Sequence, residues 1–221
     1  MKGLLYNDYM SMQKVLKTSL VIYVLFTIFS LLSDNIIFAV DYTLVFILMV
    51  PINIFYSDEK NKWEQYAFTM PVSPKQYVRE KYIFFVLTQT IGYVLAYMIV
   101  LISYMYNRES FDSTIFDMIN VTSAVSGILP VIVIPVMFKY GTEKGRITML
   151  SLLFLPFILV KVLESTSVLT SILQAIQKIA LTVEITKVFT ETHGVILFIP
   201  MIILYLISYA VSLHIYSKKE F

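Results

Sequence analysis

Apolar and polar residues follow one another along this chain in long blocks rather than in the short alternation typical of a soluble protein. A helix needs about 20 predominantly apolar residues to cross a bilayer, and several of the blocks approach or exceed that length. The blocks predict six transmembrane helices, at about residues 18–33, 38–56, 82–106, 119–138, 147–163 and 195–216. We therefore expect an all-α, polytopic integral membrane protein with a single transmembrane domain over residues 1–221.

Two segments outside these blocks are amphipathic. Near the N-terminus Leu5, Tyr9, Met12 and Leu16 repeat at helical spacing beside lysines, which predicts an interfacial helix that turns into the membrane. Residues 165–194 carry a second apolar stripe opposite polar residues. That stripe predicts an outer amphipathic helix or a short hairpin that dips into the outer leaflet.

The longest polar interval, residues 57–81, begins with the signals of a helix. Ser57 and the two acids after it suit a helix N-terminus. Trp63, Tyr66, Ala67 and Met70 follow at i, i+3, i+4 and i+7, so they form one apolar stripe on an otherwise charged helix. The stripe fits a surface that binds a soluble partner and equally fits an amphipathic turn lying on lipid headgroups.

A second helix is predicted to start within the same interval. Pro71 cannot continue the first helix because it lacks an N–H group. Ser73, Pro74 and Gln76 then read as an N-cap, a first helical position and the far side of a capping box. A helix from Pro74 through the third span is longer than the hydrocarbon core, so its first turns should stand out of the membrane.

The composition agrees with a membrane protein. The chain is 58% hydrophobic and 14% charged, whereas a soluble domain is closer to about 45–50% and about 25%. The mean hydropathy is +0.77. There are no cysteines, which excludes disulfides, thiolate metal sites and a cysteine nucleophile. The net charge of +2 gives no argument for nucleic acid as a partner.

Lysine and arginine are distributed unequally between the two sides that six spans would define. Of the 17, all but Arg108, Lys161, Lys178 and Lys187 fall on one side, which also holds both termini and residues 57–81. Cytoplasmic loops carry the excess of Lys and Arg in membrane proteins. We therefore expect both termini and residues 57–81 in the cytoplasm.

Motifs for catalysis or metal binding are not found in the sequence. Residues 141–145 only resemble a phosphate-binding loop and lack the G-K-[ST] ending. They also match G-x-x-x-G, but their charged surroundings argue against close helix packing there. His193 and His214 lie at opposite ends of the last predicted span, and no H-E-x-x-H is present. We expect no catalytic, cofactor-binding or metal site in this chain.

The predicted spans also lack the ionisable residues that ion-coupled transport usually needs. Asp41, Lys161 and Glu164 all fall near the outer ends of the predicted spans, so no ionisable side chain is expected near a midplane. The sequence therefore favours transport that is powered by a separate protein. The charged interval at residues 57–81 is the one sizeable predicted cytoplasmic surface that could receive energy from it.

The sequence resembles the membrane subunits of ABC-2 type transporters, in particular the small six-span permeases of Gram-positive bacteria. Within them it is most similar to the permeases that export phenol-soluble modulin peptides. Pro74 departs from the basic residue expected after Val-Ser. The residues that carry the resemblance, besides the N-terminal Met1–Leu5 pattern, are Glu59, Trp63, Tyr66, Thr69, Pro71, Val72, Ser73, Lys75, Lys81 and Tyr82.

The resemblance implies a bacterial plasma-membrane complex in which two permeases, identical or sister subunits, pair side by side. Each rests on a cytoplasmic ABC ATPase, which holds the ATP and magnesium. The interval at residues 57–81 then acts as a coupling helix seated in the ATPase. The apolar anchors of this coupling helix are Trp63, Tyr66 and Met70. Its polar rim consists of Lys75, Arg79 and Lys81. A smaller second contact with the ATPase involves Lys144 and Arg146.

The cargo implied by the resemblance is an amphipathic peptide of cytolytic or antimicrobial type. The apolar, aromatic spans suit an amphipathic or lipid-like cargo, although lipid-facing helices have the same composition. Two other functions stay open on the sequence alone. One is a membrane sensor or immunity scaffold that does not transport, and the other is a membrane-embedded enzyme or ion-coupled carrier.

Overall fold

The computed structural model describes residues 2–33, 35–69, 72–107, 113–164 and 195–218. Every secondary-structure element in these ranges is helical, which confirms the all-α prediction there. The predicted outer segment at residues 165–194 lies outside the described residues, as do Met70 and Pro71. The side chains of residues 156–164 are also outside them, so the positions of Lys161 and Glu164 are not placed.

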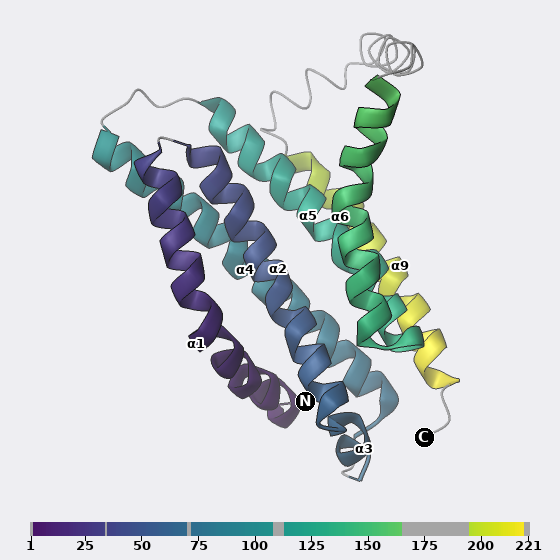
Figure 1. Ribbon diagram of the computed structural model, residues 1–221. Helices are drawn as coiled ribbons and strands as arrows, with labels where there is room; N and C mark the ends of the chain where they lie inside the picture. Colours follow the sequence, from purple (N-terminus) through teal and green to yellow (C-terminus); the bar gives the residue numbers. More distant parts are fainter. Residues whose placement is uncertain (1, 34, 70–71, 108–112, 165–194, 219–221) are drawn as a thin grey trace.

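The long helices form two groups that lean against each other (Figure 1). One group contains α1, α2 and α4, and the other contains α5, α6 and α9. Contacts of α4 with α9 and of α2 with α5 join the groups. The elements are α1 (Lys2–Leu32), α2 (Ile36–Lys60), α3 (Trp63–Ala67), α4 (Pro74–Asn107), α5 (Ser113–Tyr140), α6 (Thr142–Glu164), η1 (Val195–Leu197) and α9 (Phe198–Ser217).

Four stretches of described helix are long and apolar enough to cross a membrane, namely Ile36–Lys60, Pro74–Met105, Ile115–Tyr140 and Val195–Ser217. A shorter apolar helix covers Ser19–Leu32. These stretches correspond to predicted spans two, three, four, six and one, respectively. The total of six spans remains a prediction. Helix α1 runs without a break from Lys2 to Leu32, and its N-terminal part bends away from the rest (Figure 1). The position of this N-terminal part at the membrane interface remains a prediction.

The interval after α2 differs from the sequence expectation. Ser57 does not begin a new helix, since α2 continues to Lys60. The chain breaks at Lys62, whose backbone is left-handed with φ of 52°, and α3 is a single five-residue helix. The predicted capping box is present, because the Gln76 N–H donates to Ser73 Oγ at 3.3 Å and the Ser73 N–H donates to Gln76 Oε1 at 3.1 Å. The helix α4 starts at Pro74.

The turn between α5 and α6 corrects a second expectation. Gly141 has φ of +87°, a conformation that favours glycine, and it reverses the chain between the two helices. A Cβ added at Gly145 would collide with the buried side chain of Met137. The prediction that close helix packing is absent at residues 141–145 was therefore wrong, because the packing partner lies on the preceding helix.

Candidate functional site

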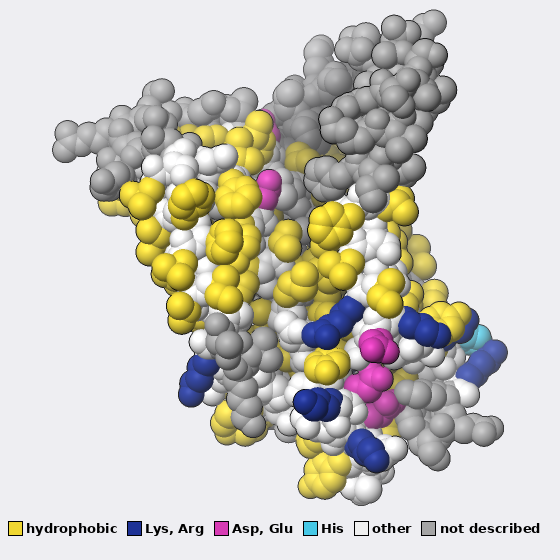
Figure 2. Space-filling view, in the orientation of Figure 1, with side chains coloured by type: hydrophobic (Ala, Val, Ile, Leu, Met, Phe, Trp, Pro, Cys, Tyr) yellow, Lys and Arg dark blue, Asp and Glu magenta, His cyan; other side chains and the backbone are white. Residues whose placement is uncertain are grey.

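One end of the molecule holds α3, the first turn of α1 and the last turn of α9 (Figure 1), and we call it the α3 end. Figure 2 shows that Lys, Arg, Asp and Glu side chains gather at this end, while the middle of the visible face is mainly apolar. The described charged residues of the predicted coupling interval all belong to it. The α3 end is thus the polar surface of a largely apolar body.

Four ionisable side chains lie inside the α3 end, and we call them the ion cluster: Asp8, Asp58, Glu80 and Lys81. Lys81 Nζ donates to both carboxylate oxygens of Asp8 at 2.8 Å and to Asp58 Oδ2 at 2.5 Å. The Lys81 side chain is only 1% exposed, so these bonds are formed away from water. The ion cluster therefore connects α1, α2 and α4 through one ammonium group.

Glu80 adds a third carboxyl group to the same ammonium. Its Oε2 lies 3.7 Å from Lys81 Nζ, and its side chain is 1% exposed. Neither of its carboxyl oxygens has a hydrogen-bond partner among the described residues. Removing a charge from water costs several kcal/mol unless a partner compensates it. The integrity of this end consequently depends on Lys81, which faces all three carboxyl groups.

Aromatic rings surround the ion cluster and extend it towards α9. Lys81 Nζ lies 5.3 Å from the ring centre of Phe55 and 5.4 Å from that of Tyr77. The Tyr77 ring stacks on Tyr216 of α9 with 5.6 Å between centroids. The Tyr216 hydroxyl donates to Glu64 Oε1 at 2.6 Å, which ties α9 to α3.

The surface of α3 is aromatic. The rings of Trp63 and Tyr66 lie 5.4 Å apart, and Tyr66 is 58% exposed. Trp63 is partly buried and packs against the core of this end, while Ala67 is fully buried beneath the helix. The small helix is therefore anchored by one face and presents an aromatic ring on the other.

A second connection runs from α2 to the start of α6. Glu59 Oε2 accepts a hydrogen bond from the Thr142 N–H at 2.7 Å, where a carboxylate suits the first turn of a helix. Arg146 donates to Asn53 Oδ1 at 2.8 Å, and its guanidinium lies 4.3 Å from the ring centre of Tyr56. The α5–α6 turn is thereby fixed to the segment of α2 that precedes α3.

Residues 3–217 match the family model described as ABC-2 family transporter protein. The chain belongs to the ABC-2 transporter family. Comparisons with curated proteins and with solved structures gave no significant match. As a member of this family the chain is a multi-pass membrane subunit of a transporter, and the family implies partnership with an ABC ATPase.

The structure distributes the predicted coupling residues of this ABC-2 permease over three environments. Lys81 is buried in the ion cluster and does not lie on a surface rim. Trp63, Val72 and Arg146 are partly buried. The remaining described members are exposed, namely Glu59, Tyr66, Thr69, Ser73, Lys75, Arg79 and Lys144.

Sequence reasoning missed the carboxyl groups of the ion cluster. Asp8 lies three residues after Leu5 and four before Met12, so it falls on the apolar stripe of the N-terminal segment. A carboxylate on an apolar stripe that becomes buried needs a cation beside it, so the sequence position of Asp8 could have predicted a buried ion pair. Asp58 was interpreted as an acid at a helix N-terminus, which the continuous α2 excludes. No group of three or more metal-ligating side chains that could hold an ion is found in the described ranges.

Proposed function

We propose that this ABC-2 family chain is the permease subunit of an ATP-driven exporter that takes mechanical work from a separate cytoplasmic ABC ATPase through α3. The observation that carries the proposal is the exposed aromatic ring of Tyr66 on α3, a short helix that is hydrogen-bonded to α9 through Glu64 and Tyr216. Large aromatic residues surrounded by charges are typical of protein-binding hot spots. A surface of this kind suits a soluble partner.

The contacts of α3 suggest how a push from the ATPase reaches the transmembrane helices. Glu64 connects α3 to α9 through Tyr216. Asp58, shortly before α3 on α2, connects to α4 and α1 through Lys81. Because these bonds are short and lie partly or fully out of water, a displacement of α3 should also move the helix ends to which it is bonded. The smaller contact through Lys144 and Arg146 lies on α6, whose start is bonded to Glu59.

The remaining partners follow from the same proposal. Two permeases, identical or sister subunits, pair in the bacterial plasma membrane with their α3 ends and both termini in the cytoplasm. ATP and magnesium are bound by the ATPase. The common position of α3, the start of α1 and the end of α9 in Figure 1 supports a single cytoplasmic side.

The proposed cargo is an amphipathic peptide of the cytolytic or antimicrobial kind, such as a phenol-soluble modulin. Apolar and aromatic side chains cover the transmembrane body, which suits a cargo with an apolar face. A reconstituted complex should change its ATPase rate when such peptides are added. A rate that stays flat across a set of amphipathic peptides would remove this cargo from the proposal.

Co-purification with the partner ABC ATPase tests the coupling role. The wild-type chain should retain the ATPase, and the double substitution Trp63→Ala and Tyr66→Ala should lose it. Gln65→Ala is the matched control, because Gln65 is exposed on the same five-residue helix. All variants should elute as the same monodisperse species, which separates a lost interface from a misfolded chain.

Retention of the ATPase by the double variant would show that α3 is not the coupling surface. A non-transporting sensor or immunity scaffold makes a different prediction, namely a cellular phenotype that persists when the ATPase is deleted. An exporter should lose its phenotype in the same cells.

A further inference from the structure

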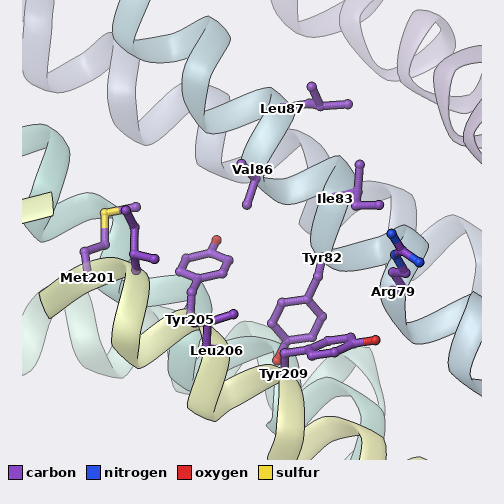
Figure 3. Close-up of a pocket in the computed structure, with 10 residues that line it drawn as sticks. Arg79, Tyr82, Ile83, Val86, Leu87, Met201, Tyr205, Leu206 and Tyr209 are labelled. Atoms are coloured by element: carbon purple, nitrogen blue, oxygen red, sulfur yellow. The ribbon is translucent and has the colours of Figure 1, made fainter. Parts of the chain in front are cut away.

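A groove of about 620 Å³ runs between α4 and α9 on the outer surface of the bundle. On α4 it is lined at intervals of three and four residues, from Arg79 at the α3 end to Leu87. On α9 it is lined from Tyr209 to Met201 (Figure 3). Its rim includes Leu87 and Leu206, which are 51% and 64% exposed, so the groove opens to the surroundings of the apolar body.

The floor of the groove is closed by a bonded tyrosine. The Tyr82 hydroxyl is 2.6 Å from Ser208 Oγ and 2.8 Å from Ser212 Oγ, which holds α4 against α9. The Tyr82 ring also contacts Tyr205 and Tyr209 edge to face, at 6.0 and 5.3 Å between centroids. The groove is therefore a formed depression between two joined helices and not a gap that the helices could close.

The residues lining the groove include one cation, Arg79, and no carboxylate. Arg79 is exposed and forms no ion pair or hydrogen bond with the side chains that the structure describes. Figure 3 shows Arg79 at one end of the groove, with the Tyr209 hydroxyl directed to the same end. A guanidinium with free donors above an apolar depression suits an anionic group attached to an apolar chain.

Tyr205 supplies a second polar group deeper in the groove. It is 8% exposed, and its hydroxyl has no hydrogen-bond partner among the described residues. In Figure 3 this hydroxyl points from α9 towards α4. A buried hydroxyl without a hydrogen-bond partner is unfavourable, because it has lost its hydrogen bonds to water. A ligand with an acceptor below its anionic group would remove that penalty.

We propose that the α4–α9 groove is a binding site for an anionic glycerophospholipid. The phosphate lies at Arg79, an ester carbonyl accepts from Tyr205, and an acyl chain fills the apolar remainder. From Arg79 to Leu87 the helix rises by eight residue steps, which is about 12 Å along its axis. That length is close to half of the ~30 Å hydrocarbon core, the depth of one leaflet.

The lining of the groove favours a lipid over a helical peptide. Arg79 is the one charged side chain among the residues that line it, and it lies at one end of the groove (Figure 3). The other lining residues are apolar or aromatic. A single phosphate joined to hydrocarbon chains matches this division, whereas an amphipathic helix also has a polar face, which the apolar groove would leave without hydrogen-bond partners.

Native mass spectrometry of the full chain tests this site without any ATPase. The protein is equilibrated in micelles with equal amounts of phosphatidylglycerol and phosphatidylcholine that carry the same acyl chains. The wild type should retain phosphatidylglycerol preferentially, and Arg79→Gln should lower that preference about tenfold, the effect of one lost charge-assisted contact. Lys139→Gln is the control, since Lys139 is an exposed cation of the same end that does not line the groove.

A second variant tests the apolar part of the site. Val86→Trp fills the groove and should lower retention of both lipids, while Tyr205→Phe should weaken retention less than Arg79→Gln. Soluble sn-glycerol 1-phosphate should not displace the lipid, because it lacks the acyl chain. An unchanged lipid preference in Arg79→Gln, or displacement by glycerol phosphate or by an anionic amphipathic peptide, would overturn the proposal.

Discussion

Lys81 donates to both carboxylate oxygens of Asp8 at 2.8 Å, across 73 positions of the chain. This pair joins the first helix to the fourth at the end of the molecule that carries α3. Asp58, on α2, shares the same ammonium. Three helices that the sequence places far apart are therefore held by one buried cation beside the proposed coupling helix.

Replacing Lys81 by Met should destabilise the protein strongly. The change leaves Asp8, Asp58 and Glu80 buried without a cation, and breaking a buried ion pair costs about 3–5 kcal/mol. The measurement is the apparent free energy of unfolding in mixed micelles. Lys75→Met is the control, because Lys75 is an exposed lysine on the same helix. Equal stability of the two variants would contradict the account.

Removing the carboxylates together with the cation should restore much of the loss. Well-packed neutral groups often replace a buried ion cluster at little cost. The combined variant Asp8→Asn, Asp58→Asn, Glu80→Gln and Lys81→Met should therefore be more stable than Lys81→Met alone. If the ion cluster also transmits motion, the combined variant should bind the ATPase but couple ATP hydrolysis to transport poorly. Normal coupling in a stable combined variant would limit the ion cluster to a structural role.

Gly145→Ala should destabilise the α5–α6 pair. The new methyl group would collide with Met137, which is buried, and overpacking of this kind costs about 1–3 kcal/mol. Gly3→Ala is the matched control, because no atom lies within 4 Å of the added Cβ. Alanine is the better helix former, so Gly3→Ala should be neutral or slightly stabilising. Unfolding in micelles separates the two, and a neutral Gly145→Ala would show that the helices are not packed as described.

Gln65→Cys should be modified only from the cytoplasmic side. The chain has no cysteine, so a single introduced thiol is labelled without background. Gln65 is exposed on α3, and the substitution leaves the aromatic rings of this helix in place. A membrane-impermeant maleimide should react in inverted vesicles and not in intact cells. Reaction in intact cells would place α3 outside and remove the basis for ATPase coupling.

The hydrophobic pattern predicted much of the fold because membrane helices are determined locally. The blocks that became α2, α4, α5 and α9 are long and apolar, and each corresponds to a helix that can cross a bilayer. The capping box at Ser73 and Gln76 was also predictable, since both partners lie within one turn. The continuation of α2 through Ser57 was not, because tertiary contacts outweighed a local capping signal there.

The candidate site was predictable only in part. The i, i+3 spacing of Trp63 and Tyr66 identified an aromatic surface, and the structure places both rings on α3. The burial of Lys81 could not be read locally, since its partners come from helices at distant positions in the chain. A lysine in a polar interval reads as a surface residue unless its carboxylate partners are known.

The most direct test of the coupling role is a cross-link from α3 to the ATPase. A photoreactive phenylalanine analogue placed at Tyr66 preserves a large aromatic ring on α3. The Tyr66 side chain is 58% exposed, so the analogue can reach a bound partner. The account predicts an ultraviolet-dependent product that contains the permease and the ABC ATPase, and no such product from the same analogue at Tyr9, which is 47% exposed on α1. Absence of the Tyr66 product from an intact, ATP-hydrolysing complex would contradict the account.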